Sequence, residues 1–240
     1  MLRQLIRSNP LGIITTAISS ETYPLLQSSH IPFLLDVQDE SSETENGILR
    51  GHLARQNPQA KAMIDSLKSQ QQPIANFLEQ EVLVLFNSPV SHYVTPKFYT
   101  ETKPSTGKVV PTWNYAAVQV YGRAKIYFDS SLDETTVFLS KQISDLSQHA
   151  EELIMGYTGT GTNPTAWTTS DAPERYTQLL AKNIVGIEIV IDRLEGKFKM
   201  SQELRPGDRE GVIHGFEALG SEAGHQMAEI VSERGRLLCS

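Results

Sequence analysis

Cysteine is almost missing from this chain of 240 residues: the single one is Cys239, next to the last residue. One cysteine cannot form a disulfide within the chain, and it cannot supply the several thiolates of a structural zinc site. The sequence therefore excludes a disulfide framework. Its composition is typical of a reducing compartment, so we expect a cytoplasmic protein.

Long apolar runs and clusters of positive charge are missing as well. No stretch of the sequence is apolar over the length that a membrane span requires, so we expect no membrane partner. The 21 Lys and Arg residues are scattered among 28 Asp and Glu residues, which gives a formal net charge of −7. Because nucleic-acid binding depends on clustered positive charge, and no helix-turn-helix is recognisable, the sequence disfavours a nucleic-acid partner.

The usual signatures of nucleophilic catalysis and of phosphate binding are also missing. The sequence contains no GxSxG motif and no cysteine with a paired base. The stretch 156–170 is rich in Gly and Thr, but it reads GxGxxP and not GxGxxG. We interpret this stretch as a surface loop.

The most informative stretch is 103–128. It begins with the turn formers KPSTG, and from Ala116 on it alternates between two faces, which is the period of a half-buried strand. Gly122 lies inside this run and predicts a bulge or a close approach by another group. Trp113, Asn114 and Tyr115 stand at the entrance of the strand. They form the wall of a ligand pocket, or else Trp113 and Tyr115 cap a barrel end.

Short strands dominate the middle of the chain, with helices before and after them. Further strands are predicted at 11–17, 30–37, 47–55, 81–87, 91–95, 184–192 and 197–201, the last two joined by a turn at 195–196. Helices are predicted at 1–8, 57–67, 132–146, 172–183, 206–219 and 221–234. The pattern indicates a mainly β fold with α (α+β), a small antiparallel barrel with peripheral helices.

His52 is the first candidate for chemistry. It lies in the sequence RGHLAR at 50–55, and its small neighbours Gly51 and Ala54 leave room for a flat ring. A neutral imidazole at this position could ligate haem iron or form a hydrogen bond with a flavin. It could equally be a histidine with a structural role in the barrel, and the local pattern does not decide between these readings.

Cationic and polar side chains at strand ends are the second group of candidates. A flavin phosphate or the propionates of haem need two or three such partners. The candidates are Arg55, Asn57, Lys97, Lys103, Lys108 and Lys199. Taken singly, each is more typical of a solvated surface group.

Several longer segments carry a resemblance to a known family. They are HIPFLLD at 30–36, RGHLARQNPQ at 50–59, VLVLFNSPVSHYVTPKFY at 82–99, GKVVPTWNYAAVQVYG at 107–122, DAPERY at 171–176 and RLEGKFKMSQ at 193–202. In sequence and in order they resemble the PaiB family, also called the FMN-binding type 2 family. The resemblance covers most of residues 1–205.

The resemblance implies an FMN-binding split β-barrel that forms a homodimer, with a cofactor, FMN or haem b, at the dimer interface. Members of the family have been described as transcriptional regulators and as FMN binders. One branch resembles the haem-dependent piperazate synthases, which form an N–N bond by cyclising N5-hydroxyornithine. The histidine of the GHLAR motif, which is the axial haem ligand in that branch, corresponds to His52.

The expected site follows from these considerations. His52 is the expected catalytic residue and, if the cofactor is haem, the axial ligand of the iron. The expected cofactor contacts are His52, Arg55, Asn57, Thr95, Lys108, Trp113 and Asn114. Arg55 and Lys108 would anchor an anion, and Trp113 and Asn114 would form the pocket wall.

The chain departs from the family pattern at a few positions. Gln119 replaces the histidine of the usual VHVYG, Glu203 replaces the asparagine of SQN, and 66–80 and 156–170 look inserted. We expect a split-barrel cofactor-binding domain at 1–205 and a helical extension packed on it at 206–240. The expected function is that of a redox or N–N bond-forming enzyme, and the alternative is a transcriptional regulator without catalysis.

Overall fold

The structure, a computed structural model, describes residues 1–70 and 76–237. Cys239 and part of the Gln-rich segment after Lys68 therefore lie outside the described residues. The chain forms two compact units: unit one consists of Met1–Phe86 and Gln119–Leu194, and unit two of Asn87–Val118 and Glu195–Ser240. The predicted division at residue 205 does not coincide with the division between these units.

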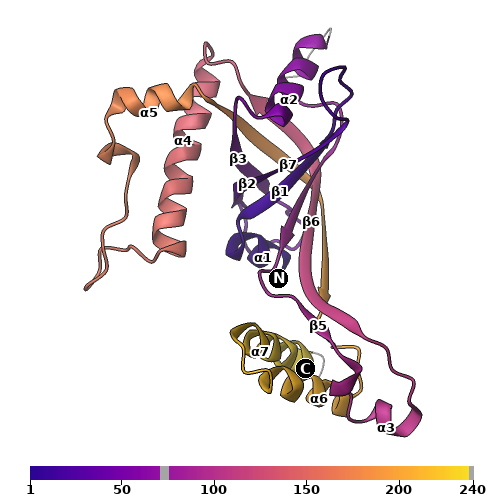
Figure 1. Ribbon diagram of the computed structural model, residues 1–240. Helices are drawn as coiled ribbons and strands as arrows, with labels where there is room; N and C mark the ends of the chain where they lie inside the picture. Colours follow the sequence, from indigo (N-terminus) through magenta and orange to yellow (C-terminus); the bar gives the residue numbers. More distant parts are fainter. Residues whose placement is uncertain (71–75, 238–240) are drawn as a thin grey trace. The chain divides into compact units, whose positions relative to one another are not determined.

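Unit one is built on an antiparallel barrel (Figure 1). Its strands follow the order β4-β1-β2-β3-β7-β6, and β4 also pairs with β6, which closes the ring. The register pairs Gly12 with Ile31, Phe33 with Gly51, and Gly51 with Ile187. The predicted α+β split barrel is thus confirmed. The strands are β1 (Leu11–Ala17), β2 (Leu26–Asp36), β3 (Ile48–Ala54), β4 (Val82–Asn87), β6 (Thr112–Tyr127) and β7 (Ile184–Lys199). The first residues of β6 and the last residues of β7 belong to unit two.

The core of unit one lies inside this barrel. Alternate residues of the strands point inward, and the rings of Phe33 and Phe86 meet edge to face there, with their centroids 6.0 Å apart. Each large apolar side chain that is fully buried stabilises the fold by about 1.5–3 kcal/mol. The alternation predicted for the long strand is confirmed, since Val120, Ala124 and Ile126 are fully buried.

Gly122 marks the close approach that the sequence predicts. A Cβ atom at this position would overlap the carbonyl oxygen of Val190 on the neighbouring strand β7. Only glycine lets the two backbones pack at this distance.

Several helices accompany the barrel of unit one, and the helix that precedes β7 stands to one side of it (Figure 1). They are α1 (Leu2–Ser8), α2 (Pro58–Ser69), α4 (Asp133–His149) and α5 (Glu174–Ala181), with a π-helical turn at Ala150–Ile154 and a 3₁₀ turn at Thr169–Asp171. The predicted start of α2 is confirmed: the side-chain oxygen of Asn57 accepts a hydrogen bond from the backbone N–H of Gln59 at 2.8 Å, and Pro58 opens the helix.

Unit two combines a short sheet with a helical hairpin. β5 (His92–Val94) pairs with the first residues of β6, and a 3₁₀ turn (Pro96–Phe98) and α3 (Thr102–Thr106) connect them. The hairpin consists of α6 (Pro206–Glu217) and α7 (Glu222–Leu237). The buried ring of Phe216 joins the two parts, with centroids 5.1 Å from the ring of His92 and 5.4 Å from that of Phe98.

Two sequence predictions are wrong in detail. The strands predicted at 184–192 and 197–201 form one strand, β7, because the backbone of Gly196 is not in the left-handed region that a turn would favour. The turn formers after Glu101 form the short helix α3, which ends at Gly107 with φ of 65°. In both places the local composition indicated a turn or loop. Strand pairing in β7 and helical hydrogen bonds in α3 determine the structure instead.

Candidate cofactor site

His52 lies on the outer face of the barrel. Strand β3 pairs with β2 on one side and with β7 on the other. Leu49, Gly51 and Leu53 are buried toward the core, and by alternation Arg50 and His52 face outward. This outer face is covered by α4, which contacts β2 and β3 (Figure 1).

A row of side chains spaced four residues apart along α4 attaches this helix to the sheet. Glu134 forms an ion pair with Lys125 of β6 at 3.1 Å. One turn later, the ring of Phe138 stacks on Tyr127 with centroids 4.0 Å apart and planes 9° apart. Residues four apart on a helix share a face, so Gln142, the next in the row, also points at the sheet and contacts β3.

Arg50 of β3 binds the C-terminal part of α4 through hydrogen bonds. Its Nη1 donates to Gln142 Oε1 at 3.2 Å, and its Nη2 donates to Asp36 Oδ1 at 3.0 Å and to Asp145 Oδ2 at 2.8 Å. The hydrogen bonds to Asp36 raise the pKa of Arg50 against the effect of burial, and those to Asp145 add to this. Burial opposes ionisation of Asp145, but hydrogen bonds from Lys141 and Arg50 outweigh it and hold the pKa of that carboxyl below its usual range.

The imidazole of His52 has no such partners. Its register neighbour on β7 is Gly186, and the ring of Phe138 fills the space that a side chain would take there. The Nδ1 atom of His52 is buried and has no hydrogen-bond partner in the part of the chain that the structure describes. Burial lowers the pKa of His52, so its ring is neutral near pH 7. Burying a ring nitrogen without a hydrogen-bond partner costs about 1–3 kcal/mol of folding free energy. A ligand that bonds to this nitrogen would recover that energy, so His52 is a candidate ligand contact.

The other two residues of unit one that we expect to contact the cofactor, Arg55 and Asn57, form hydrogen bonds within the protein. Arg55 donates from Nε to the carbonyl oxygen of Lys182 at 3.1 Å and from Nη2 to that of Phe128 at 2.5 Å. Asn57 caps α2 with its oxygen and donates from Nδ2 to Ser29 Oγ at 3.0 Å. Two of the side chains expected to contact the cofactor, Arg55 and Asn57, are therefore engaged in holding strand and helix ends.

The remaining expected contacts belong to unit two. Thr95 caps the 3₁₀ turn, and Lys108 is exposed in the loop before β6. Asn114 is fully buried and exchanges hydrogen bonds with Ser201 at 3.0 and 3.1 Å. Trp113 is 56% exposed, and its ring meets that of Tyr93 edge to face, with centroids 6.1 Å apart. The expected set is thus divided between the units: His52, Arg55 and Asn57 lie in unit one, and Thr95, Lys108, Trp113 and Asn114 in unit two.

The sequence did not lead us to predict that α4 packs on the face of β3 that carries His52. The four-residue spacing of Glu134, Phe138 and Gln142 could have indicated a helix face that packs on the sheet. No local signal shows that Phe138 is placed over Gly186, because that contact depends on the pairing of β3 with β7.

The residues around His52 fit a ring contact better than an anion contact. A neutral, partly buried imidazole with an unused nitrogen suits a flavin ring edge or haem iron. Arg55 and Asn57 are less suited to a phosphate, because part of their donors already serve the backbone and Ser29. In the described ranges, no group of three or more His, Cys, Asp or Glu side chains could hold a metal ion.

No helix of residues 1–70 and 76–237 has the length and apolar character needed to cross a bilayer.

Comparison with known proteins assigns the family. The family described as "Putative FMN-binding domain" matches residues 1–193. An uncharacterized protein of Aspergillus fumigatus is 60% identical over 98% of this chain and 93% of its own length. The Bacillus subtilis protein named protease synthase and sporulation protein PAI 2 is 24% identical over 95% of this chain and 89% of its own length.

Among solved structures, the chain is similar to the FAD and heme binding protein from Mycobacterium smegmatis. The TM-score is 0.44 at 15% sequence identity, and the match covers 89% of this chain and 76% of that one. With its barrel topology and with a family match over most of its length, this chain belongs to the PaiB family, the FMN-binding type 2 family of split-barrel proteins.

Proposed function

We propose that the protein binds a flavin, with haem as the competing cofactor, against the outer face of β3, and that it acts as a cytoplasmic redox enzyme. The observation that carries this proposal is the partly buried, neutral ring of His52 with its buried and unpartnered Nδ1. The flavin is preferred because the family to which the chain belongs is described by FMN binding.

His52 is the residue that would touch the cofactor. A neutral imidazole can form one hydrogen bond with the edge of a flavin ring, or it can give a lone pair to haem iron. Phe138 over Gly186 would limit where a flat ring can lie on the strand, and the Arg50 network would keep α4 in place beside it. When bound, the cofactor supplies the electron-transfer chemistry, and the protein supplies orientation and a dry environment.

A homodimer is part of the proposal. Helix α5 buries none of its residues, and it exposes Tyr176, Leu179 and Leu180. Helix α5 contacts α4, but this contact leaves its apolar side chains exposed, and a partner surface would cover them. A second copy of the chain is the partner that the family resemblance implies.

The narrower form of the proposal is N–N bond formation on N5-hydroxyornithine, as in the piperazate synthases. It rests on the family resemblance and requires haem ligation by His52. Gln119, at the position of the family histidine, accepts a hydrogen bond from the hydroxyl of Tyr121 at 2.5 Å, so it orients a phenol and does not act as a base. A regulator without catalysis is the competing hypothesis, and the net charge of −7 argues against direct binding to DNA.

Absorbance titrations with FMN and with hemin test the proposal. The proteins are the wild type, His52→Ala, and His30→Ala as the control for an exposed histidine on the neighbouring strand β2. We expect His52→Ala to lose the Soret band formed with hemin and to bind FMN about tenfold more weakly, the effect of losing about 1.4 kcal/mol. His30→Ala should behave as the wild type. Equal titrations for all three proteins would show that His52 is not the contact, and no uptake of either cofactor by the wild type would refute the function.

A further inference from the structure

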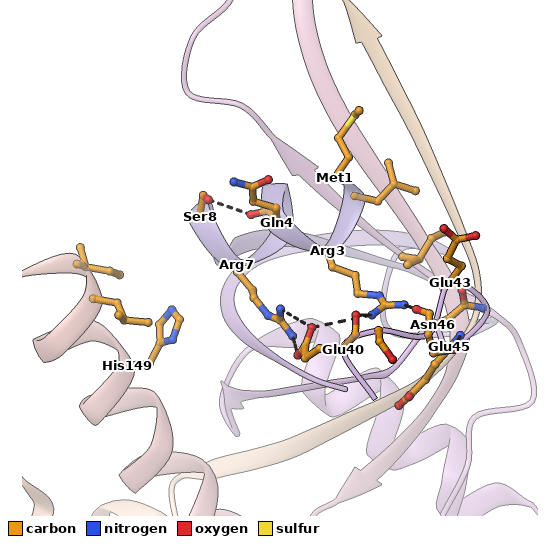
Figure 2. Close-up of a pocket in the computed structure, with 16 residues that line it drawn as sticks. Met1, Arg3, Gln4, Arg7, Ser8, Glu40, Glu43, Glu45, Asn46 and His149 are labelled. Carbon is orange, nitrogen blue, oxygen red and sulfur yellow. Dashed lines mark hydrogen bonds and ion pairs between the residues drawn. The ribbon is translucent and has the colours of Figure 1, made fainter. Parts of the chain in front are cut away.

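One cavity of unit one does not have His52 among its lining residues. Its volume is about 1040 Å³, and it is bounded by α1, the loop at 39–46 and the turn that follows α4 (Figure 2). A second cavity of about 510 Å³ lies between α4 and β2. Both are lined by Arg7, His149 and Leu153, so these three residues stand where the two cavities meet. The first volume is at the upper end of the range that holds small molecules.

Two arginines of α1 point at Glu40 in this cavity (Figure 2). Arg3 donates to the carbonyl oxygens of Glu40 and Ser42, so it holds the loop. Arg7 makes a two-pronged contact with the carboxylate of Glu40, from Nη1 at 3.0 Å and from Nη2 at 2.5 Å. The side chain of Arg7 is 38% exposed and that of Glu40 is 60% exposed. Glu40 is therefore a counter-ion on the open side of the cavity that another carboxylate can replace.

His149 supplies an unused polar atom on the opposite wall. It is the last residue of α4, and in Figure 2 it stands across the cavity from Glu43 and Glu45. Its Nε2 atom is buried and has no hydrogen-bond partner within the described part of the chain. Like His52, this ring has a nitrogen that a ligand could satisfy.

The wall next to His149 is apolar and uncovered. The π-helical turn Ala150–Ile154 follows α4 directly. It presents Leu153, which is 74% exposed, and Ile154, which is 60% exposed, to the cavity. Turns of this kind are frequent at functional sites. Apolar side chains that line a cavity and remain exposed are suited to an apolar ligand group.

We propose that this cleft binds a small organic acid with an apolar tail. The carboxylate takes the place of Glu40 on the planar guanidinium of Arg7, where two parallel hydrogen bonds favour a carboxylate. His149 donates from Nε2 to the same acid group, and the tail lies on Leu153 and Ile154. The site is separate from the one proposed for the cofactor and does not depend on it.

Octanoate is the probe for a calorimetric titration of the full chain. Octanol and octylamine are the control compounds, because they have the same alkyl chain length but a different head group. Trp167 offers a second readout by fluorescence, because it lines a small cavity together with His149 and Ile154. We expect saturable binding of octanoate that is at least tenfold tighter than that of octanol or octylamine. Affinity should also rise from butyrate to octanoate. No saturable binding, or equal binding of the three compounds, would overturn the proposal.

Two variants with opposite expected effects test the exchange at Arg7. Arg7→Gln should weaken octanoate binding at least tenfold and leave octanol unchanged. Glu40→Gln should bind octanoate several-fold more tightly, because the competing carboxylate is gone, whereas a merely structural role of the pair would give weaker binding. Arg175→Gln, an exposed charge on α5, is the matched control and should match the wild type. If Arg7→Gln equals this control, or if Glu40→Gln weakens binding, the proposal is wrong. If Arg7→Gln does not fold, the sign of the Glu40→Gln effect decides.

Discussion

The titration of His52 is coupled to folding, because burial lowers the pKa of its ring below the usual value of about 6.5. In the unfolded chain the same imidazole is solvated and binds a proton at a higher pH. Between these two pKa values the unfolded chain holds more protons than the folded one. The stability contributed by neutral His52 is therefore present above about pH 6.5 and is lost as the pH falls through the folded pKa.

We expect this coupling in urea denaturation between pH 7.5 and pH 5. The free energy of unfolding of the wild type should fall over this range, and His52→Gln should remove part of the fall because glutamine does not titrate. His30→Gln, which removes an exposed imidazole from β2, is the control. If His52→Gln shows the same pH dependence as the wild type, the ring of His52 is not buried in its neutral form.

Gly122 gives a second prediction at this scale. A methyl group there would overlap the carbonyl oxygen of Val190, and neither backbone can move without breaking the pairing of β6 with β7. We expect Gly122→Ala to lower the free energy of unfolding by about 3 kcal/mol, at the upper end for overpacking. Gly107→Ala is the comparison, since its surroundings are open and only its φ of 65° opposes a side chain, at about 1 kcal/mol. Equal effects in thermal denaturation would contradict the close approach.

Local sequence was informative where a residue's environment depends on its own strand. The alternation around His52 and the glycine at 122 both led to correct placements, because a strand has a period of two. The hydrogen bonds that Arg55 donates to backbone carbonyl groups could not be predicted in this way. Its guanidinium meets the carbonyl of Lys182, which lies 127 residues further along the chain. The burial of Asn114 against Ser201, 87 residues away, is of the same kind.

Helix α4 is attached to the barrel in part through Arg50, whose side chain is only 9% exposed. Replacing it with an apolar side chain leaves the buried oxygen of Gln142 without this donor, while Asp145 keeps its ion pair with Lys141. We expect Arg50→Met to lower the free energy of unfolding by about 2 kcal/mol, because a buried polar group loses its hydrogen bond. It should also raise hydrogen exchange in α4.

The control for this change is Arg123→Met. Arg123 is 62% exposed, and its contact with Asp192 is 3.8 Å long, so its removal should cost no more than about 1 kcal/mol. If Arg50→Met and Arg123→Met have equal effects, or if exchange in α4 is unchanged, the Arg50 network does not hold the helix.

The elements themselves were predictable to different degrees. The start of α2 follows from Asn57 and Pro58 alone, since a cap and a first-turn proline act locally. The continuous strand β7 did not follow from its sequence. Glu195-Gly196 has the composition of a turn, but an extended Gly196 is equally allowed, and strand pairing decides.

At the scale of the whole molecule, the exposed face of α5 predicts self-association. We expect a dimer in sedimentation equilibrium at micromolar concentration. Leu179→Glu should shift the mass toward the monomer, because it places a charge at the centre of an apolar face that is 53% exposed at this residue. Gln178→Glu adds the same charge at the neighbouring exposed polar position and should leave the dimer intact. A strictly monomeric wild type would remove the interfacial model of the site.

The fold and the family could be predicted from the sequence, but the complete site could not. Motifs such as GHLAR and VPTWNY mark the family because each is short and continuous. The expected contacts fall into two units, and Arg55 and Asn57 are engaged by the backbone and by Ser29. Which of them meets a cofactor depends on tertiary and quaternary contacts that no single motif encodes.

The central claim is that a cofactor meets the ring of His52, and NMR of the histidine side-chain nitrogens tests it most directly. The chain contains six histidines, and His52→Gln identifies the signal of His52. On addition of FMN we expect the ring nitrogens of His52 to shift while those of the exposed His30 do not, and on addition of hemin we expect the signal of His52 to be lost first through its bond to iron. If both cofactors leave the signal of His52 unchanged, the proposed site is wrong.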